Sequence, residues 1–183
     1  MTKEQRQAAK AINFGLLFGQ GPKGLARYAK SIYDVAMTER EAMSAKRSFF
    51  RVYHALARWQ RKTGRLSKIE KQVITLGGRV RDFTKEKHGY KYTQALNTPI
   101  QGGAAEVMLA ALPKLEGYLT GTDAKLVNII HDEIVIEAAE EDLAQVITAV
   151  DSTMVEGMLA IFPEASTKNL VEIKAGDNWA EAK

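Results

Sequence analysis

The sequence predicts an α+β fold in which helices predominate and two β-hairpins stand between them. Apolar side chains recur at helical spacing over residues 4–67, 102–119 and 139–161. Gly77 and Gly78 separate two short strand-like runs, and residues 125–138 are the most strongly β-like part of the chain. With 183 residues, of which 45% are apolar, the chain can bury a sizeable core.

The first two helices are separated by a clear break. Residues 4–19 have helical periodicity that ends at the Gly-Gln-Gly-Pro sequence of residues 19–22, and a short helix is expected over residues 23–32. Gly15 lies inside the first helix, where it costs about 1 kcal/mol relative to Ala. We therefore expect another part of the chain to approach the backbone of Gly15 closely.

A third helix is predicted from its capping residues. Thr38 and Glu41 have the spacing of a capping box, in which each side chain accepts a hydrogen bond from the backbone N–H of the other residue. This helix should run through Tyr53, and basic helical sequence continues to Ser67. Residues 73–83 then form the first hairpin, which turns at its glycines.

A long helix is expected to begin at a proline. Thr98 is predicted to be the N-cap, Pro99 the first helical residue and Gln101 the third. The body of the helix is expected over residues 102–119.

Residues 125–138 form the second predicted hairpin, with its polar tip at residues 131–133. An amphipathic helix follows over residues 139–161, opened by acidic residues that suit its positive end. Residues 170–175 are the last predicted strand.

Charge is distributed unevenly along the chain. Residues 1–93 contain 21 Lys and Arg against 7 Asp and Glu, a net +14, whereas residues 94–183 contain 5 and 15, a net −10. The positive field around residues 1–93 favours the binding of polyanions, above all nucleic acid. The alternative is a charged surface that only contacts solvent. We therefore divide the chain by function into a basic part, residues 1–94, and a second part, residues 95–183.

Several protein classes are excluded or disfavoured by composition. The chain has no Cys, which excludes disulfide scaffolds and thiolate chemistry and favours a reducing cytoplasm. No run approaches the roughly 20 apolar residues of a membrane span. The first residues contain no apolar core of a secretory signal, so we expect a cytoplasmic protein without membrane partners.

The first helix carries two cations and an aromatic side chain along one side. At about 100° per residue, Arg6, Lys10 and Phe14 lie at about 0°, 40° and 80°. Arg and Lys can bind successive phosphates while the ring lies against a sugar or base, so this side suits a nucleoside triphosphate. The alternative is an ordinary amphipathic helix with a buried Phe14.

The second hairpin carries His131, Asp132 and Glu133 at its tip. Two carboxylates at a tight turn can hold Mg²⁺ together with waters and substrate phosphates. His131 could be a ligand, a general acid or a donor to substrate. A polar turn without function and a metal-dependent nuclease are the alternatives.

These segments together resemble the family A DNA polymerases, the bacterial DNA polymerase I family. Residues 6–19, with the pattern Arg-x3-Lys-x3-Phe-Gly-x2-Phe-Gly, resemble motif B, and the Ile-His-Asp-Glu of residues 130–133 resembles motif C. Residues 75–79 and 97–106 are similar to the family's hairpin and template-primer helix. The last eight residues are similar to the family's C-terminus.

The resemblance implies an incomplete right-hand polymerase fold, with fingers helices and part of the antiparallel palm sheet. It implies that Arg6 and Lys10 bind the phosphates of a dNTP and that Lys10 protonates the leaving pyrophosphate. Phe14 would pack on the nucleotide, and Phe18 would border the templating base. Phe18 replaces the Tyr of most members, which loses a hydroxyl but keeps the ring.

The remaining implied residues contact metal and DNA. Asp132 would be the metal ligand of motif C, with Glu133 beside it and His131 near the primer terminus. The primer or template would be contacted by Arg79, Asn97 and Gln101.

Motif A, an Asp-Tyr-Ser-x-x-Glu-x-Arg pattern, does not occur in this sequence. Family members hold two Mg²⁺ ions between the motif A and motif C aspartates, so Asp132 supplies half of that site. We expect a second polypeptide to bring motif A and the thumb, as in a split polymerase acting in a bacterial nucleoid or a phage-infected cell. An inactive remnant that only binds nucleic acid is the alternative.

Overall fold

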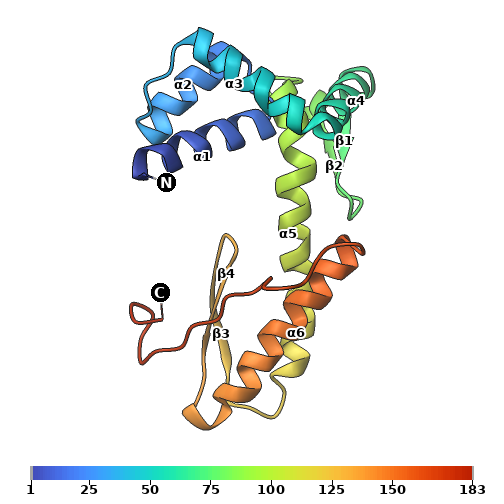
Figure 1. The fold of residues 1–183 in the computed structure, drawn as a ribbon. Coiled ribbons are helices and arrows are strands. Elements are labelled where there is room, and N and C mark those ends of the chain that lie inside the picture. The colour runs from blue at the N-terminus through green and yellow to red at the C-terminus, as the bar shows by residue number, and fades with distance from the viewer. Residues whose placement is uncertain (1, 183) are drawn as a thin grey trace. The chain divides into compact units, whose positions relative to one another are not determined.

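The computed structural model describes residues 2–182, and its elements confirm the α+β fold class (Figure 1). They are, in chain order, α1 (Lys3–Leu17), α2 (Pro22–Tyr33), α3 (Glu39–Val52), α4 (His54–Glu70), β1 (Gln72–Ile74), β2 (Val80–Asp82), the 3₁₀ turn η1 (Phe83–Lys85), α5 (Tyr92–Tyr118), β3 (Lys125–Ile130), β4 (Glu133–Glu137), the 3₁₀ turn η2 (Glu140–Asp142) and α6 (Leu143–Ile161). The chain divides into two compact units, residues 1–100 and 101–183, and the boundary lies inside α5. Within residues 2–182, every helix is too short or too polar to cross a membrane.

In the first unit, α1 packs closely on α2. A Cβ placed on Gly15 of α1 would lie 2.5 Å from Leu25 Cδ1 and 3.3 Å from Tyr28 Cδ1, so the close approach predicted at Gly15 is confirmed. Leu16 and Leu25 are fully buried and form a cluster with Ala42 of α3. Burial, together with the Tyr33 hydroxyl, raises the pKa of Tyr28 to about 12.

The capping box predicted at the start of α3 is confirmed. Thr38 Oγ1 accepts from the Glu41 N–H at 3.2 Å, and Glu41 Oε2 accepts from the Thr38 N–H at 2.8 Å. Hydrogen bonds to the Glu41 carboxylate from the Thr38 N–H and the Thr38 hydroxyl hold the pKa of Glu41 below its ordinary value. Tyr53 ends α3 and precedes the first residue of α4, so the predicted helical sequence up to Ser67 consists of two helices.

The hairpin β1–β2 is also confirmed. The strands pair antiparallel with Gln72 opposite Asp82 and Ile74 opposite Val80. Val73 and Phe83 form a small core with Ala95.

The predicted start of α5 is wrong, because the helix begins at Tyr92 and Pro99 lies inside it. Thr98 is not an N-cap: its hydroxyl donates to Gln94 O at 2.8 Å, one helical turn earlier. The reason is tertiary packing. Leu96 is fully buried, and the Tyr92 ring lies directly against Gly64 of α4.

In the second unit, α5 and α6 approach each other at small residues. A Cβ on Gly157 of α6 would lie 2.7 Å from Val107 O and 2.9 Å from Ala111 Cβ. The core of this unit consists of Leu115 of α5, Leu119 just after that helix, and Val146 and Ala149 of α6. The partly buried Ile134 and Ile136 of β4 pack against this core.

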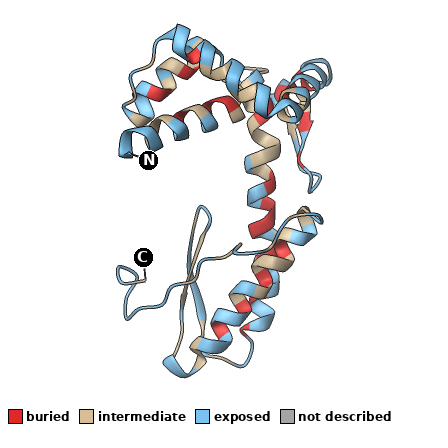
Figure 2. Ribbon diagram, viewed as in Figure 1, coloured by how far each residue is buried: buried red, intermediate tan, exposed pale blue. Residues whose placement is uncertain are grey.

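The hairpin β3–β4 confirms the second predicted hairpin, with an irregularity in register between Leu126 and Asn128. Figure 2 shows that β3 is largely exposed. The acidic residues 140–142 form η2 ahead of α6 instead of its first turn.

The predicted strand over residues 170–175 is wrong. A strand needs a neighbouring backbone with which to form a hydrogen-bonded ladder. Within residues 2–182 this segment pairs with no other strand, because β3 and β4 pair only with each other.

Candidate functional site

The cations of α1 lie on the exposed side of the helix. Arg6 and Lys10 are both exposed, and neither forms a salt bridge with another residue in the described range 2–182. A capping box between Thr2 and Gln5 begins the helix just before them. Packing of α1 on α2 through the buried Ala11, Gly15 and Leu16 leaves both cations available to an anionic ligand.

Two aromatic rings follow the cations along α1. Phe14 and Phe18 are stacked, with ring centroids 6.3 Å apart and an interplanar angle of 25°. Phe14 is 42% exposed, which contradicts the alternative in which this ring is buried. The helix therefore presents positive charge and then an aromatic surface, an arrangement that suits a phosphorylated aromatic ligand.

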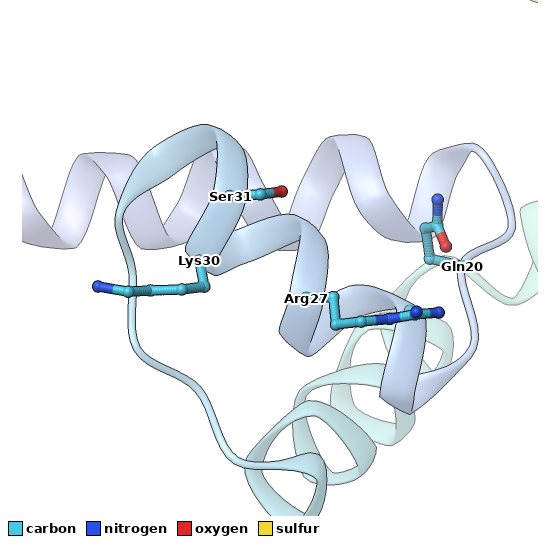
Figure 3. Close-up of a pocket in the computed structure, with 5 residues that line it drawn as sticks. Gln20, Arg27, Lys30 and Ser31 are labelled. Atoms are coloured by element: carbon cyan, nitrogen blue, oxygen red, sulfur yellow. The ribbon is translucent and has the colours of Figure 1, made fainter.

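A shallow pocket of about 590 Å³ lies beside this helix pair, lined by Gln20, Gly24, Arg27, Lys30 and Ser31 (Figure 3). The Arg27 and Lys30 side chains both line the pocket and extend in opposite directions. Lys30 is paired with Asp34 at 2.5 Å, and this pair holds the pKa of the Asp34 carboxyl below its ordinary value. None of the predicted site residues lines this pocket.

Arg79 lies at the end of the hairpin β1–β2. Its backbone N–H donates to Thr75 Oγ1 at 2.9 Å, and its carbonyl accepts from the Thr75 N–H at 3.0 Å. Gly78, just before it, has φ +91°, which glycine adopts without strain. The turn thus holds the backbone of Arg79 while the residue is exposed.

Asn97 and Gln101 both belong to α5. Asn97 is half-buried, and its Oδ1 is buried with no hydrogen-bond partner among residues 2–182, as is Oε1 of Gln94 one turn earlier. Sequence reasoning missed Gln94, because a lone Gln in a helix carries no signal of burial. Gln101 is exposed and begins the second unit.

The tip of the hairpin β3–β4 is shorter than predicted. Glu133 is the first residue of β4 and pairs with Ile130, so the turn consists of His131 and Asp132 alone. Two residues are enough to connect antiparallel strands in a hairpin, so Glu133 can already pair in β4. His131 has φ +55°, and both turn residues are exposed.

Glu133 is held by a residue distant in sequence. Its Oε1 accepts a hydrogen bond from Trp179 Nε1 at 2.7 Å. The two residues are 46 positions apart, so no local pattern could have revealed this contact.

The carboxylates of the tip fit a partial magnesium site. Hard cations such as Mg²⁺ take one or two protein carboxylates and complete their shell with water and phosphate oxygens, and Asp132 offers an exposed carboxylate of this kind. Among residues 2–182 no group of three or more His, Asp or Glu side chains is gathered to hold a metal. Asp132 and Glu133 can therefore contribute ligands, and further oxygens must come from elsewhere.

The predicted residues thus lie in two sets. Arg6, Lys10 and Phe14 belong to α1 in the first unit, and Phe18 is the C-cap of that helix. The first unit also contains Arg79 and Asn97. His131, Asp132 and Glu133 adjoin one another in the second unit, which also contains Gln101.

The family model for DNA polymerase family A matches residues 1–181. The chain belongs to this family. DNA polymerase I of Aquifex aeolicus is 35% identical over 186 residues, which cover 99% of this chain and 31% of the relative. DNA polymerase I of Pseudomonas aeruginosa is 31% identical, covering 98% of this chain and 19% of the relative. The thermostable DNA polymerase I of Thermus aquaticus is 30% identical, covering 97% and 21%. This family A chain therefore spans less than a third of the length of these relatives.

A solved structure agrees with the fold of the family A chain. The POL domain of Pol1 from M. smegmatis, solved in complex with DNA primer-template and dNTP, matches with a TM-score of 0.74 at 23% identity. The match covers 85% of this chain and 28% of that one. The α+β architecture predicted from the sequence is thereby confirmed as that of part of a polymerase domain.

Proposed function

We propose that this chain is the fingers and palm portion of a template-directed DNA polymerase that transfers nucleotides from dNTPs to a primer. The observation that carries the proposal is the exposed side of α1 in a family A chain. There Arg6 and Lys10 are unpaired within the described residues, and the stacked Phe14 and Phe18 follow them. Residues 1–94 provide the basic part and residues 95–183 the acidic part that contains the hairpin tip.

The α1 residues would bind and position the dNTP. Arg6 can donate two parallel hydrogen bonds to the terminal phosphate, while Lys10 acts as a point charge on the next phosphate. Phe14 would lie against the sugar and base, and Phe18 would border the templating base. When the primer 3′-oxygen bonds to the α-phosphorus, the bond to pyrophosphate breaks, and Lys10 would give that leaving group a proton.

Asp132 and Glu133 would hold Mg²⁺. The ion, when bound, neutralises phosphate charge and increases the acidity of the primer hydroxyl. The Trp179 indole orients the Glu133 carboxylate through its hydrogen bond of 2.7 Å. His131, in the same turn, would lie near the primer terminus.

Arg79, Asn97 and Gln101 would contact the primer-template. The exposed Arg79 and Gln101 can reach a nucleic-acid strand without rearrangement of their elements. Side chains that donate and accept hydrogen bonds can read base edges in the minor groove, where purines and pyrimidines present acceptors.

A complete metal site needs a carboxylate from outside these 183 residues. We propose that a second polypeptide carrying motif A and the thumb supplies it, and that the pair acts where bacterial or phage DNA is replicated or repaired. The chain alone would then bind substrates without extending a primer.

Primer extension tests this proposal. The chain alone, a polypeptide carrying motif A and the thumb, and their mixture are each given a labelled primer-template, Mg²⁺ and dNTPs. We expect template-directed extension by the mixture only. Robust extension by the isolated chain would refute the partial metal site, and no extension by the mixture would refute the polymerase assignment.

The same assay distinguishes a second candidate function, a nucleic-acid-binding module without catalysis. The net +14 of residues 1–93 favours it independently of the hairpin tip. Binding of DNA without extension in any mixture would support this module. Shortening of the labelled primer without dNTPs would instead support a metal-dependent nuclease.

A further inference from the structure

The helix α4 carries a continuous row of cations that the proposed function does not use. We call it the α4 stripe, and its residues are Arg58, Arg61, Lys62, Arg65 and Lys68. At about 100° per residue these five side chains lie within about 120° of arc. All five are exposed, and within residues 2–182 none forms a salt bridge.

The opposite side of α4 is fixed to the rest of the first unit. Buried Gln60 donates from Nε2 to Leu16 O at 2.7 Å and to Leu17 O at 2.9 Å, so it satisfies the last carbonyls of α1. The Tyr90 hydroxyl donates to Gly64 O at 2.9 Å. These contacts prevent α4 from turning about its axis, so the stripe stays directed away from the core of its unit.

The geometry of the stripe matches an extended polyanion. At about 1.5 Å per residue, Arg58 and Lys68 are about 15 Å apart along the helix, which is a distance over which duplex DNA carries several phosphates. Five like charges in a row repel one another, and Glu70 is the only acidic residue in α4. A strand of phosphates would relieve this repulsion and release its own counterions.

We propose that the α4 stripe binds the phosphate backbone of nucleic acid, through residues other than the predicted DNA contacts Arg79, Asn97, Gln101 and His131. This inference rests on the proposed function, since primer-template is the nucleic acid that this function requires. The stripe reads no bases, so it adds affinity without sequence preference.

A pair of matched variants tests the stripe. The first variant is Arg58→Gln/Lys62→Gln/Lys68→Gln. The control, Arg40→Gln/Lys87→Gln/Lys91→Gln, also removes one Arg and two Lys from exposed positions of the first unit. Binding of a labelled duplex and of a labelled single strand is measured by fluorescence anisotropy between 50 and 200 mM salt, without dNTP or Mg²⁺. Circular dichroism confirms that both variants fold.

We expect the stripe variant to lower the slope of log affinity against log salt by about 2.7 for duplex or about 2 for a single strand, since each phosphate contact contributes about 0.9 or 0.7. The control should leave the slope nearly unchanged. The nucleic acid that shows the fuller loss is the form that the stripe binds. Equal losses in the two variants, or no loss in either, would overturn the inference, because net charge alone would then explain binding.

Three further results separate this inference from its rivals. Polyglutamate that displaces the DNA as well as unlabelled DNA does, at equal charge concentration, would overturn the choice of nucleic acid as partner. A normal salt slope in the stripe variant, together with extension by the mixture described above, would refute the stripe and leave the polymerase assignment intact. A reduced slope without any extension by the wild-type mixture would refute that assignment and support the stripe as a binding site.

Discussion

Gly157, in α6, lies in close contact with helix α5. This contact predicts that adding a single methyl group at position 157 destabilises the second unit. In Gly157→Ala the new Cβ would lie 2.7 Å from Val107 O and 3.1 Å from Ala111 N. Both are backbone atoms, which cannot avoid the methyl group by changing rotamer, so the helices must separate. Overpacking of this kind costs about 1–3 kcal/mol. Replacing Gly by Ala in a helix interior contributes about 1 kcal/mol of stability.

We therefore expect a net loss of up to about 2 kcal/mol in the free energy of unfolding of the second unit. For a domain of about this size, each kcal/mol corresponds to about 4–8 °C in Tm. Urea and thermal unfolding followed by circular dichroism measure the change.

Gly117→Ala is the matched control. Gly117 also lies in a helix, α5, but a Cβ there meets no atom within 4 Å. This variant should be more stable than the wild type by up to about 1 kcal/mol. If Gly157→Ala were as stable as Gly117→Ala, the close packing of α5 on α6 would not explain a requirement for Gly at position 157.

The other predictions concern catalysis and pH. In the reconstituted mixture, Asp132→Ala should lower the rate more than tenfold, a loss of over about 1.4 kcal/mol of transition-state stabilisation, with little change in DNA affinity; a smaller loss would mean that Asp132 is not a metal ligand. Lys10→Ala should reduce both dNTP affinity and rate, whereas an effect on rate alone would contradict its contact with ground-state phosphate. Hydrogen bonds from Lys114 and then Tyr118 hold the pKa of Glu156 below its ordinary 4.5. Glu156 therefore stabilises the fold above pH 4.5, and this contribution is lost as the pH falls through the lowered pKa. Urea unfolding at several acidic pH values should show a shallower loss for Glu156→Gln than for the wild type, and parallel losses would contradict the assignment.

Local signals in the sequence predicted those elements whose ends are decided locally. Thr38 and Glu41 satisfy each other's backbone, so the start of α3 follows from four residues. The two hairpins follow from glycine-containing or short polar turns between strand-like runs. The placing of Arg6, Lys10 and Phe14 on one side of α1 follows from helical spacing, whereas Phe18 was predicted only from the resemblance to family A.

Tertiary contacts decide what the sequence could not predict. The first turns of α5 are stabilised by burial of Leu96 and by contact of Tyr92 with Gly64, which outweigh the local signal at Pro99. Residues 170–175 have the composition of a strand but pair with no other strand in the described range. The hydrogen bond from Trp179 to Glu133 joins residues that only the fold brings together.

The left-handed backbone of His131 restricts which residues can precede Asp132. With φ at +55°, a residue branched at Cβ would strain the turn, and even an unbranched residue other than Gly costs about 1–2 kcal/mol there. Asn, Asp and His adopt this region more readily than other residues that carry a Cβ. Replacement of His131 by Asn would thus preserve the turn, whereas Val would distort it whatever chemistry the imidazole performs. The backbone conformation of this turn therefore limits substitution at position 131 independently of any role of the imidazole.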